Sequence, residues 1–227
     1  MSDGLPVVLV DLDGTVLRSS AGRHAMLGAV AEVAGRPVDD MDRATFTGRT
    51  DAWIAAELLR RAGHPGDPEG VRRVHARYLE LLEEHLLSRG CRATPGARAL
   101  GFALRDAAAD GRCHAHYLLT GNLREGARRK LAAAGLDDVF PVEGAFGDRH
   151  EDRAHVAAEA AGMAPAGARP VVLGDAPADL VAGRAIGARV VLVATGPVPA
   201  GDLRALSPDA LLDDLSDTAA ALAVLFG

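Results

Sequence analysis

Two aspartates stand two positions apart at the end of a short apolar run near the start of the chain. The segment VVLVDLDGTVL covers residues 7–17 and places Asp11 and Asp13 directly after VVLV. A run of Val and Leu of this length is typical of a buried strand. Because aspartate is also common in turns, the pair taken alone fits an ordinary strand end equally well. It points to chemistry only if other polar residues converge on it.

Other polar residues follow two later apolar runs in the same way. They are Thr120, Gly121 and Asn122 after residues 114–119, and Asp175 and Asp179 after residues 170–173. Since ligands of open α/β sheets bind beyond the carboxyl ends of the strands, we expect all of them at one rim with the first pair. Crowded carboxylates repel and raise one another's pKa unless a cation neutralises them. Oxygen ligands of this kind suit Mg²⁺, which keeps waters for a phosphate ligand.

The segments that must position these residues alternate between strand and helix. Strands are predicted at residues 5–10, 114–119, 170–173 and 190–193, and helices at 97–109, 124–134, 152–161, 178–186 and 216–226. Gly135, Gly162 and Gly187 stand where helix C-caps would fall. This alternation predicts an α/β fold around a parallel sheet.

The first two strands are too far apart for a simple crossover. A parallel connection needs roughly a dozen residues, usually one helix. The intervening segment contains helical patterns at residues 23–33, 51–61 and 69–87, and Thr94-Pro95-Gly96 precedes the next core helix. We therefore predict an all-helical cap domain inserted at residues 18–90, with residues 1–17 and 91–227 forming the core domain.

Composition narrows the possible partners. The net charge of −6 gives no reason to expect nucleic acid or an anionic membrane as a partner. The sequence contains no apolar stretch long enough to span a bilayer. Cys91 and Cys113 have no paired spacing, so we expect free thiols and a cytoplasmic protein. Lys130 is the only lysine, so any chemistry that needs an amine has one candidate.

Three segments together resemble a known family. DLDGTV, LLTGN and GDAPAD are similar to motifs one, two and four of the haloacid dehalogenase (HAD) superfamily. The resemblance implies a Rossmann-like, three-layer core with a helical cap inserted after the first strand. The position and size of the cap resemble the phosphoglycolate phosphatase and β-phosphoglucomutase group.

The resemblance assigns the two catalytic carboxylates. Asp11 would attack phosphorus to give an aspartyl-phosphate. Asp13 would protonate the leaving alkoxide and then deprotonate the attacking water. Dehalogenases of the superfamily need no acid for a halide and do not carry the second aspartate. The presence of Asp13 therefore favours phosphoryl transfer over dehalogenation.

The same resemblance assigns the metal and phosphate contacts. Mg²⁺ would be held by the Asp11 carboxylate, the Asp13 backbone carbonyl and Asp175. Asp179 is grouped with these metal residues, as a support of the metal shell or a helix cap rather than as a direct ligand. Thr120 would bind the phosphoryl oxygens, and Gly121 and Asn122 are expected to contact the substrate beside it.

The third family motif deviates. It usually supplies a lysine, but GAFGDRHEDRAHVAAEAAG between motifs two and four contains none. Lys130 comes too early and is expected to point to solvent. The candidate replacements are Arg153, at the start of the next predicted helix, and Arg149, in the loop before it. The resemblance favours Arg153, because subgroups of the superfamily with an FGxxxxDR-like segment use such an arginine. Either could instead be a surface arginine paired with Glu151 or Asp152.

The cap should select the substrate. In FTGRTDAWI, residues 46–54, Arg49 resembles a residue that grips a carboxylate or second phosphate. An exposed loop arginine is the competing interpretation. Thr50 is expected to cap the following helix, and Trp53 is expected in the core rather than as a substrate platform.

The predicted function is a Mg²⁺-dependent phosphatase for a small, phosphoglycolate-like monoester, acting as a monomer or homodimer. The alternative is a sugar-phosphate mutase of the β-phosphoglucomutase type. A phosphonatase is disfavoured because its cap supplies a Schiff-base lysine and residues 18–90 contain none. A receiver-like phospho-acceptor or a non-catalytic binding protein fits less well, because the former carries no inserted cap and the latter would not need Asp11, Asp13 and Asp175.

Overall fold

A computed structural model describes residues 4–40, 46–148 and 150–227. Its centre is a parallel sheet of six strands in the order β5-β4-β1-β6-β7-β8. The strands are β1 (Pro6–Val10), β4 (Ala115–Leu119), β5 (Gly144–Ala145), β6 (Arg169–Gly174), β7 (Arg189–Val193) and β8 (Ala210–Leu212). Every neighbouring pair runs parallel, so the predicted α/β fold with a parallel sheet is confirmed.

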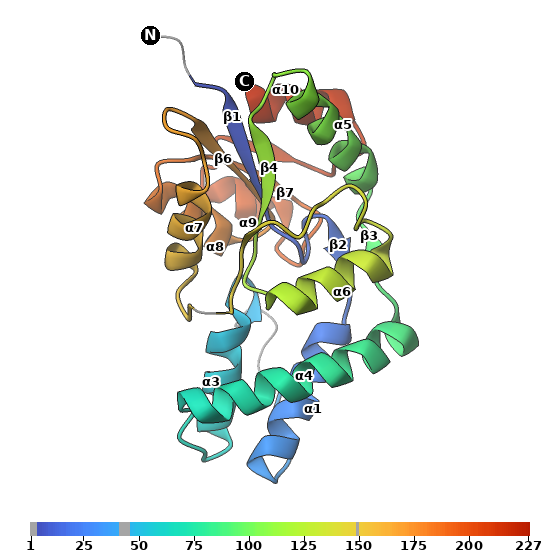
Figure 1. The fold of residues 1–227 in the computed structure, drawn as a ribbon, viewed down its shortest axis with the longest axis vertical. Coiled ribbons are helices and arrows are strands. Elements are labelled where there is room, and N and C mark those ends of the chain that lie inside the picture. The colour runs from blue at the N-terminus through green and yellow to red at the C-terminus, as the bar shows by residue number, and fades with distance from the viewer. Residues whose placement is uncertain (1–3, 41–45, 149) are drawn as a thin grey trace.

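Helices cover both faces of the sheet and complete a three-layer core (Figure 1). One face packs against α5 (Ala97–Ala109), α6 (Arg124–Ala134) and α10 (Thr218–Phe226). The other packs against α7 (Arg153–Gly162), α8 (Pro177–Ala185) and α9 (Ala200–Ala205). Successive strand side chains point to opposite faces, so Val8 and Val10 join the first cluster while Val7 and Leu9 join the second.

The segment between β1 and α5 is mainly helical in the described residues. Helices α1 (Ala21–Ala34), α3 (Asp51–Arg61) and α4 (Pro68–Arg89) pack around a separate apolar cluster that includes Met26, Leu58 and Leu82. A short antiparallel ribbon of β2 (Leu17–Arg18) and β3 (Arg92–Ala93) pairs the two connections to the core. We call residues 18–90 the cap; its domain boundaries stay a prediction.

The long elements were predicted to within a few residues, whereas short ones were missed. Strands β5 and β8, helix α9 and the β2–β3 ribbon are too short to carry a hydrophobic period. Gly135 is a left-handed C-cap as predicted, and Gly187 is left-handed one residue beyond the cap of α8. The C-cap assigned to Gly162 is wrong, because Gly162 is the last residue of α7 and Met163 is the C-cap. Among the described residues, no helix has the length and apolar character needed to cross a membrane.

Candidate active site

The strand order brings the predicted rim residues together. Strand β1 lies between β4 and β6, so Asp11, Thr120 and Asp175 follow three adjacent parallel strands. Between this rim and the cap lies a cavity of about 950 Å³. Its lining includes nearly all of the predicted site residues: Asp11, Asp13, Arg49, Thr120, Gly121, Asn122, Arg153, Asp175 and Asp179.

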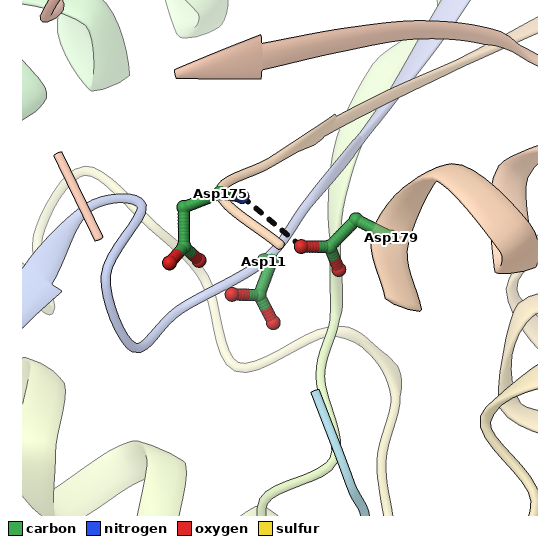
Figure 2. A group of neighbouring side chains, drawn as sticks. All are labelled: Asp11, Asp175 and Asp179. Atoms are coloured by element: carbon green, nitrogen blue, oxygen red, sulfur yellow. Dashed lines mark hydrogen bonds between the residues drawn. The ribbon is translucent and has the colours of Figure 1, made fainter. Parts of the chain in front are cut away.

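Three carboxylates form a compact, buried cluster at the bottom of the cavity. Asp11, Asp175 and Asp179 each offer one oxygen such that the three oxygens lie within 4.8 Å of one another (Figure 2). Burial, opposed by Arg153 and reinforced by Asp179, raises the pKa of Asp11 to about 7. Burial and the nearby Asp11 raise the pKa of Asp175 well above its usual range. Among the described residues, the three carboxylates of the cluster are paired with one cationic side chain, Arg153.

A cation would fit this cluster. The carboxylate oxygen Oδ2 of Asp175 is buried and has no hydrogen-bond partner within the described part of the chain. Thr15, which donates to Asp11 Oδ2 at 3.3 Å and to Asp175 Oδ1 at 3.1 Å, holds the two carboxylates at the site. Hard oxygen donors with an unsatisfied charge are the set that a small divalent cation prefers. The buried acidic cluster could thus bind a metal ion.

Asp179 organises the turn behind this cluster. Its Oδ2 accepts a hydrogen bond from the backbone N–H of Asp175 at 3.0 Å (Figure 2). The same oxygen accepts another from the backbone N–H of Ala176, also at 3.0 Å. Its Oδ1 accepts from the guanidinium of Arg153. A carboxylate at this position satisfies N–H groups at the start of α8. Both oxygens already have protein partners, which is consistent with the supporting role suggested for Asp179.

Arg153 places a positive charge directly beside Asp11. It is the first residue of α7 and is 8% exposed. Its Nη2 donates to Asp11 Oδ1 at 2.6 Å, to Leu119 O at 3.4 Å and to Asp179. The alternative of a surface arginine is therefore wrong for Arg153. The competing candidate Arg149 lies outside the described residues.

Lys130 contradicts its prediction. It was expected to point to solvent, but it is 5% exposed and its Nζ lies 2.7 Å from Asp13 Oδ2 and 2.5 Å from Asn122 Oδ1. Side chains of a helix lean toward its N-terminus, and the N-terminus of α6 follows the loop that holds Asn122. Although burial alone would lower the pKa of Lys130, Asp13 and other nearby groups raise it.

The loop after β4 forms hydrogen bonds to Asp13 and to the cap. Asn122 Nδ2 donates to Asp13 Oδ2 at 2.7 Å and to Thr120 Oγ1 at 2.8 Å. The Gly121 carbonyl accepts from Asp51 N at 2.7 Å. A Cβ on Gly121 would lie 2.3 Å from the Arg49 carbonyl oxygen, so this close approach of the cap requires glycine. Substrate contacts of Gly121 and Asn122 stay a prediction.

The cap presents Arg49 at the cavity wall. Arg49 is exposed, and its guanidinium carbon lies 4.5 Å from the centre of the Trp53 ring. Trp53 is half-buried against the apolar cluster of the cap, close to its predicted core position. Thr50 caps α3 as predicted, because its Oγ1 accepts from Trp53 N at 3.1 Å.

The sequence indicated the carboxylates but missed three supporting residues: Thr15, Asp51 and Lys130. Thr15 stands in the DLDGT segment, which could have drawn attention to it. The Asp51 carboxylate crosses from the cap to accept from Leu123 N at 2.9 Å. Only the uniqueness of Lys130 among the basic residues marked it in the sequence.

Comparison with known protein families gives a match over most of the chain. A family model for haloacid dehalogenase-like hydrolases matches residues 5–187. No curated protein matches the sequence.

Similar solved structures share the fold over nearly the whole chain. CbbY from Rhodobacter sphaeroides in complex with phosphate has 19% identity and a TM-score of 0.69, covering 94% of this chain and 96% of its own. A predicted phosphoglycolate phosphatase from Haemophilus somnus has 18% identity and a TM-score of 0.68, covering 98% and 99%. A putative β-phosphoglucomutase from Bacteroides vulgatus has 19% identity and a TM-score of 0.67, covering 99% and 90%.

Proposed function

Because the chain belongs to the haloacid dehalogenase-like hydrolase family, we propose that it is a Mg²⁺-dependent phosphatase. Its substrate would be a small phosphate monoester, and hydrolysis would proceed through an aspartyl-phosphate at Asp11. The observation that carries the proposal is the pairing of two differently held carboxylates at one cavity. Asp11 is buried against Arg153, whereas Asp13 has a side chain that is 38% exposed and is held by Asn122 and Lys130.

The proposed reaction has two steps, and each of them transfers a phosphoryl group and a proton. An Asp11 oxygen attacks phosphorus, the bond from phosphorus to the ester oxygen breaks, and Asp13 gives its proton to the leaving alkoxide. A water then attacks phosphorus and loses its proton to Asp13. The bond from phosphorus to Asp11 breaks, which releases inorganic phosphate and restores both carboxyl groups.

Charge compensation supports the assignment of Asp11 as nucleophile. Arg153 Nη2, 2.6 Å from Asp11 Oδ1, favours the ionised form that attack requires. Mg²⁺ held by the Asp11 carboxylate, the Asp13 backbone carbonyl and Asp175 would neutralise charge on the transferring group. Thr120 is 1% exposed and lines the cavity, and in this proposal it would contact the phosphoryl oxygens.

Arg49 supports a small substrate with an additional anionic group. Its guanidinium carbon lies 4.5 Å from the centre of the Trp53 ring, and Arg49 lines the same cavity as the acidic cluster. A planar fork binds a carboxylate or phosphate through two hydrogen bonds. A phosphoglycolate-like ester is therefore the first candidate substrate.

A mutase is the second candidate because the cavity offers room and charge for two phosphates. Its volume is about 950 Å³, and its basic lining extends well beyond Arg153: Arg18, Arg23, Arg49, Arg89, Arg92 and Lys130. A neighbour of the same fold is CbbY, one form of which was solved with xylulose-(1,5)bisphosphate.

A metabolite panel separates the two candidates. Wild-type protein and Asp11→Asn are incubated with Mg²⁺ and a panel of phosphate monoesters that includes phosphoglycolate and glucose 1-phosphate with its bisphosphate. Release of inorganic phosphate by wild type alone supports the phosphatase, and isomerised sugar phosphate supports the mutase. Phosphate release by Asp11→Asn at the wild-type rate, or no reaction of wild type with any ester, overturns the proposal.

A further inference from the structure

Lys130 and Asn122 converge on a single oxygen of Asp13. The Lys130 ammonium and the Asn122 amide each donate to Asp13 Oδ2 at 2.7 Å, and they bond to each other at 2.5 Å. Asp13 Oδ1 accepts no hydrogen bond from any described residue, and Asp13 lines the cavity. One oxygen is thus anchored on the protein while the other is left to face the substrate.

The ammonium of Lys130 is also enclosed by the cap. Helix α6 runs between the sheet and α4 (Figure 1). A Cβ built on Gly22 of α1 would lie 3.1 Å from Lys130 Nζ, 3.2 Å from its Cε and 3.4 Å from the hydroxyl of Tyr78 on α4. The negative charge of Asp51 on α3 also helps to raise the pKa of Lys130. Helices α1 and α4 of the cap therefore border one core side chain that holds Asp13.

On this geometry, and on the proposed phosphatase function, we propose that Lys130 is a positioning residue for Asp13. It fixes Oδ2 of Asp13 so that Oδ1 points at the leaving oxygen, and the cap keeps Lys130 in place. Among the described residues, the ammonium is the one charged group bonded to Asp13, so an apolar side chain of similar length removes this charged anchor without opening a large void. The proton itself still moves between Asp13 and the substrate oxygen.

Leaving-group dependence separates positioning of an acid from a merely structural role. The leaving group of an aryl phosphate such as 4-nitrophenyl phosphate departs as a phenolate without a proton, whereas the alkoxide of an alkyl phosphate needs a proton from an acid. The ratio kcat/KM covers events up to release of the alcohol, so it excludes the later attack of water. Lys130→Met should lower kcat/KM by roughly 100-fold with an alkyl phosphate but by under about tenfold with the aryl phosphate.

A variant in the cap tests the same contact without a substitution in the core domain. Gly22→Ala pushes a methyl group toward Lys130 Nζ, and about a threefold loss selective for the alkyl phosphate is expected. Gly28→Ala is the matched control, because it lies on the same helix and its Cβ would contact Leu81 at the same 3.1 Å. That control should keep the wild-type ratio between the two substrates.

The outcomes are distinct. Equal losses with both substrates in Lys130→Met, or no loss, overturn the inference. If Lys130→Met does not fold, a selective loss in Gly22→Ala but not in Gly28→Ala supports it, and equal behaviour of those two variants overturns it. A wild-type protein that hydrolyses neither ester instead defeats the proposed function on which the inference rests.

Discussion

Replacing Asp51 with asparagine should stabilise the protein in a pH-dependent way. Asp51 begins α3, is 9% exposed and accepts a hydrogen bond from Leu123 N, which an asparagine side-chain oxygen can also accept. Burial, opposed by Lys130 and by the Leu123 hydrogen bond, raises its pKa from 3.8 to about 6. The folded state therefore resists ionisation of this carboxyl group more than the unfolded chain does.

The pKa shift gives both sign and size. The stability that a raised carboxyl pKa supports is fully present below the unfolded pKa near 3.8 and is lost as pH rises through about 6. At 1.36 kcal/mol per unit, the wild type loses about 3 kcal/mol relative to Asp51→Asn across this window. About 2 kcal/mol of that difference falls between pH 4.5 and pH 7.5.

Denaturant unfolding at these two pH values measures the difference directly. The free energy of unfolding of Asp51→Asn should exceed that of wild type at pH 7.5 by more than at pH 4.5, with unchanged m-values. Asp138→Asn is an opposite control, because Arg98 lowers the pKa of Asp138. That variant should become less stable than wild type as pH rises, by a small amount because the pair is exposed. A gap between Asp51→Asn and wild type that is constant or shrinks with pH would refute the reasoning.

Three further predictions concern the site itself. Arg153→Met should lower kcat/KM by about 10²–10³-fold in steady-state kinetics. Arg153→Lys should recover part of this loss, since one nitrogen of Arg153 makes all of its side-chain hydrogen bonds to described residues. Mg²⁺ at about 100 times its Kd should stabilise the wild type by about 2.7 kcal/mol in thermal unfolding, and Asp175→Asn far less at the same concentration. Gly14→Ala should lose at least about 1–2 kcal/mol in denaturant unfolding, because Gly14 has a φ of 95° and its Cβ would lie 2.2 Å from Asp175 Oδ2. Wild-type values in any of these variants would contradict the corresponding contact.

The sequence was informative where polar residues follow long apolar runs. The family resemblance is confirmed by the match over residues 5–187, and the alternating pattern predicted the parallel sheet. Asp11, Thr120 and Asp175 follow adjacent strands because parallel strands end at one rim. The position of each residue directly after a strand was therefore sufficient to predict that the three lie close together.

The supporting contacts could not be predicted, because they depend on how the cap packs against the core. Lys130 directly follows two basic residues of the same helix, Arg128 and Arg129, which pair with Glu125, so its sequence context resembles a solvated face. In the structure it is buried, with Asp13 and Asn122 of the core and Gly22 of the cap around its ammonium. In the sequence, Asp51 likewise resembles an ordinary acidic residue in the first turn of a helix. The structure shows that its carboxylate crosses from the cap to the core and accepts a hydrogen bond from Leu123 N.

The most direct test of the central claim is to trap the covalent intermediate at Asp11. Protein turning over a phosphate monoester with Mg²⁺ is quenched rapidly and treated with borohydride, which reduces an acyl phosphate to an alcohol, and the peptide with residues 7–17 is read by mass spectrometry. We predict that position 11 is converted to homoserine in wild type and that Asp11→Asn shows neither conversion nor phosphate release. Steady release of phosphate by wild type with an unmodified Asp11 would contradict the account.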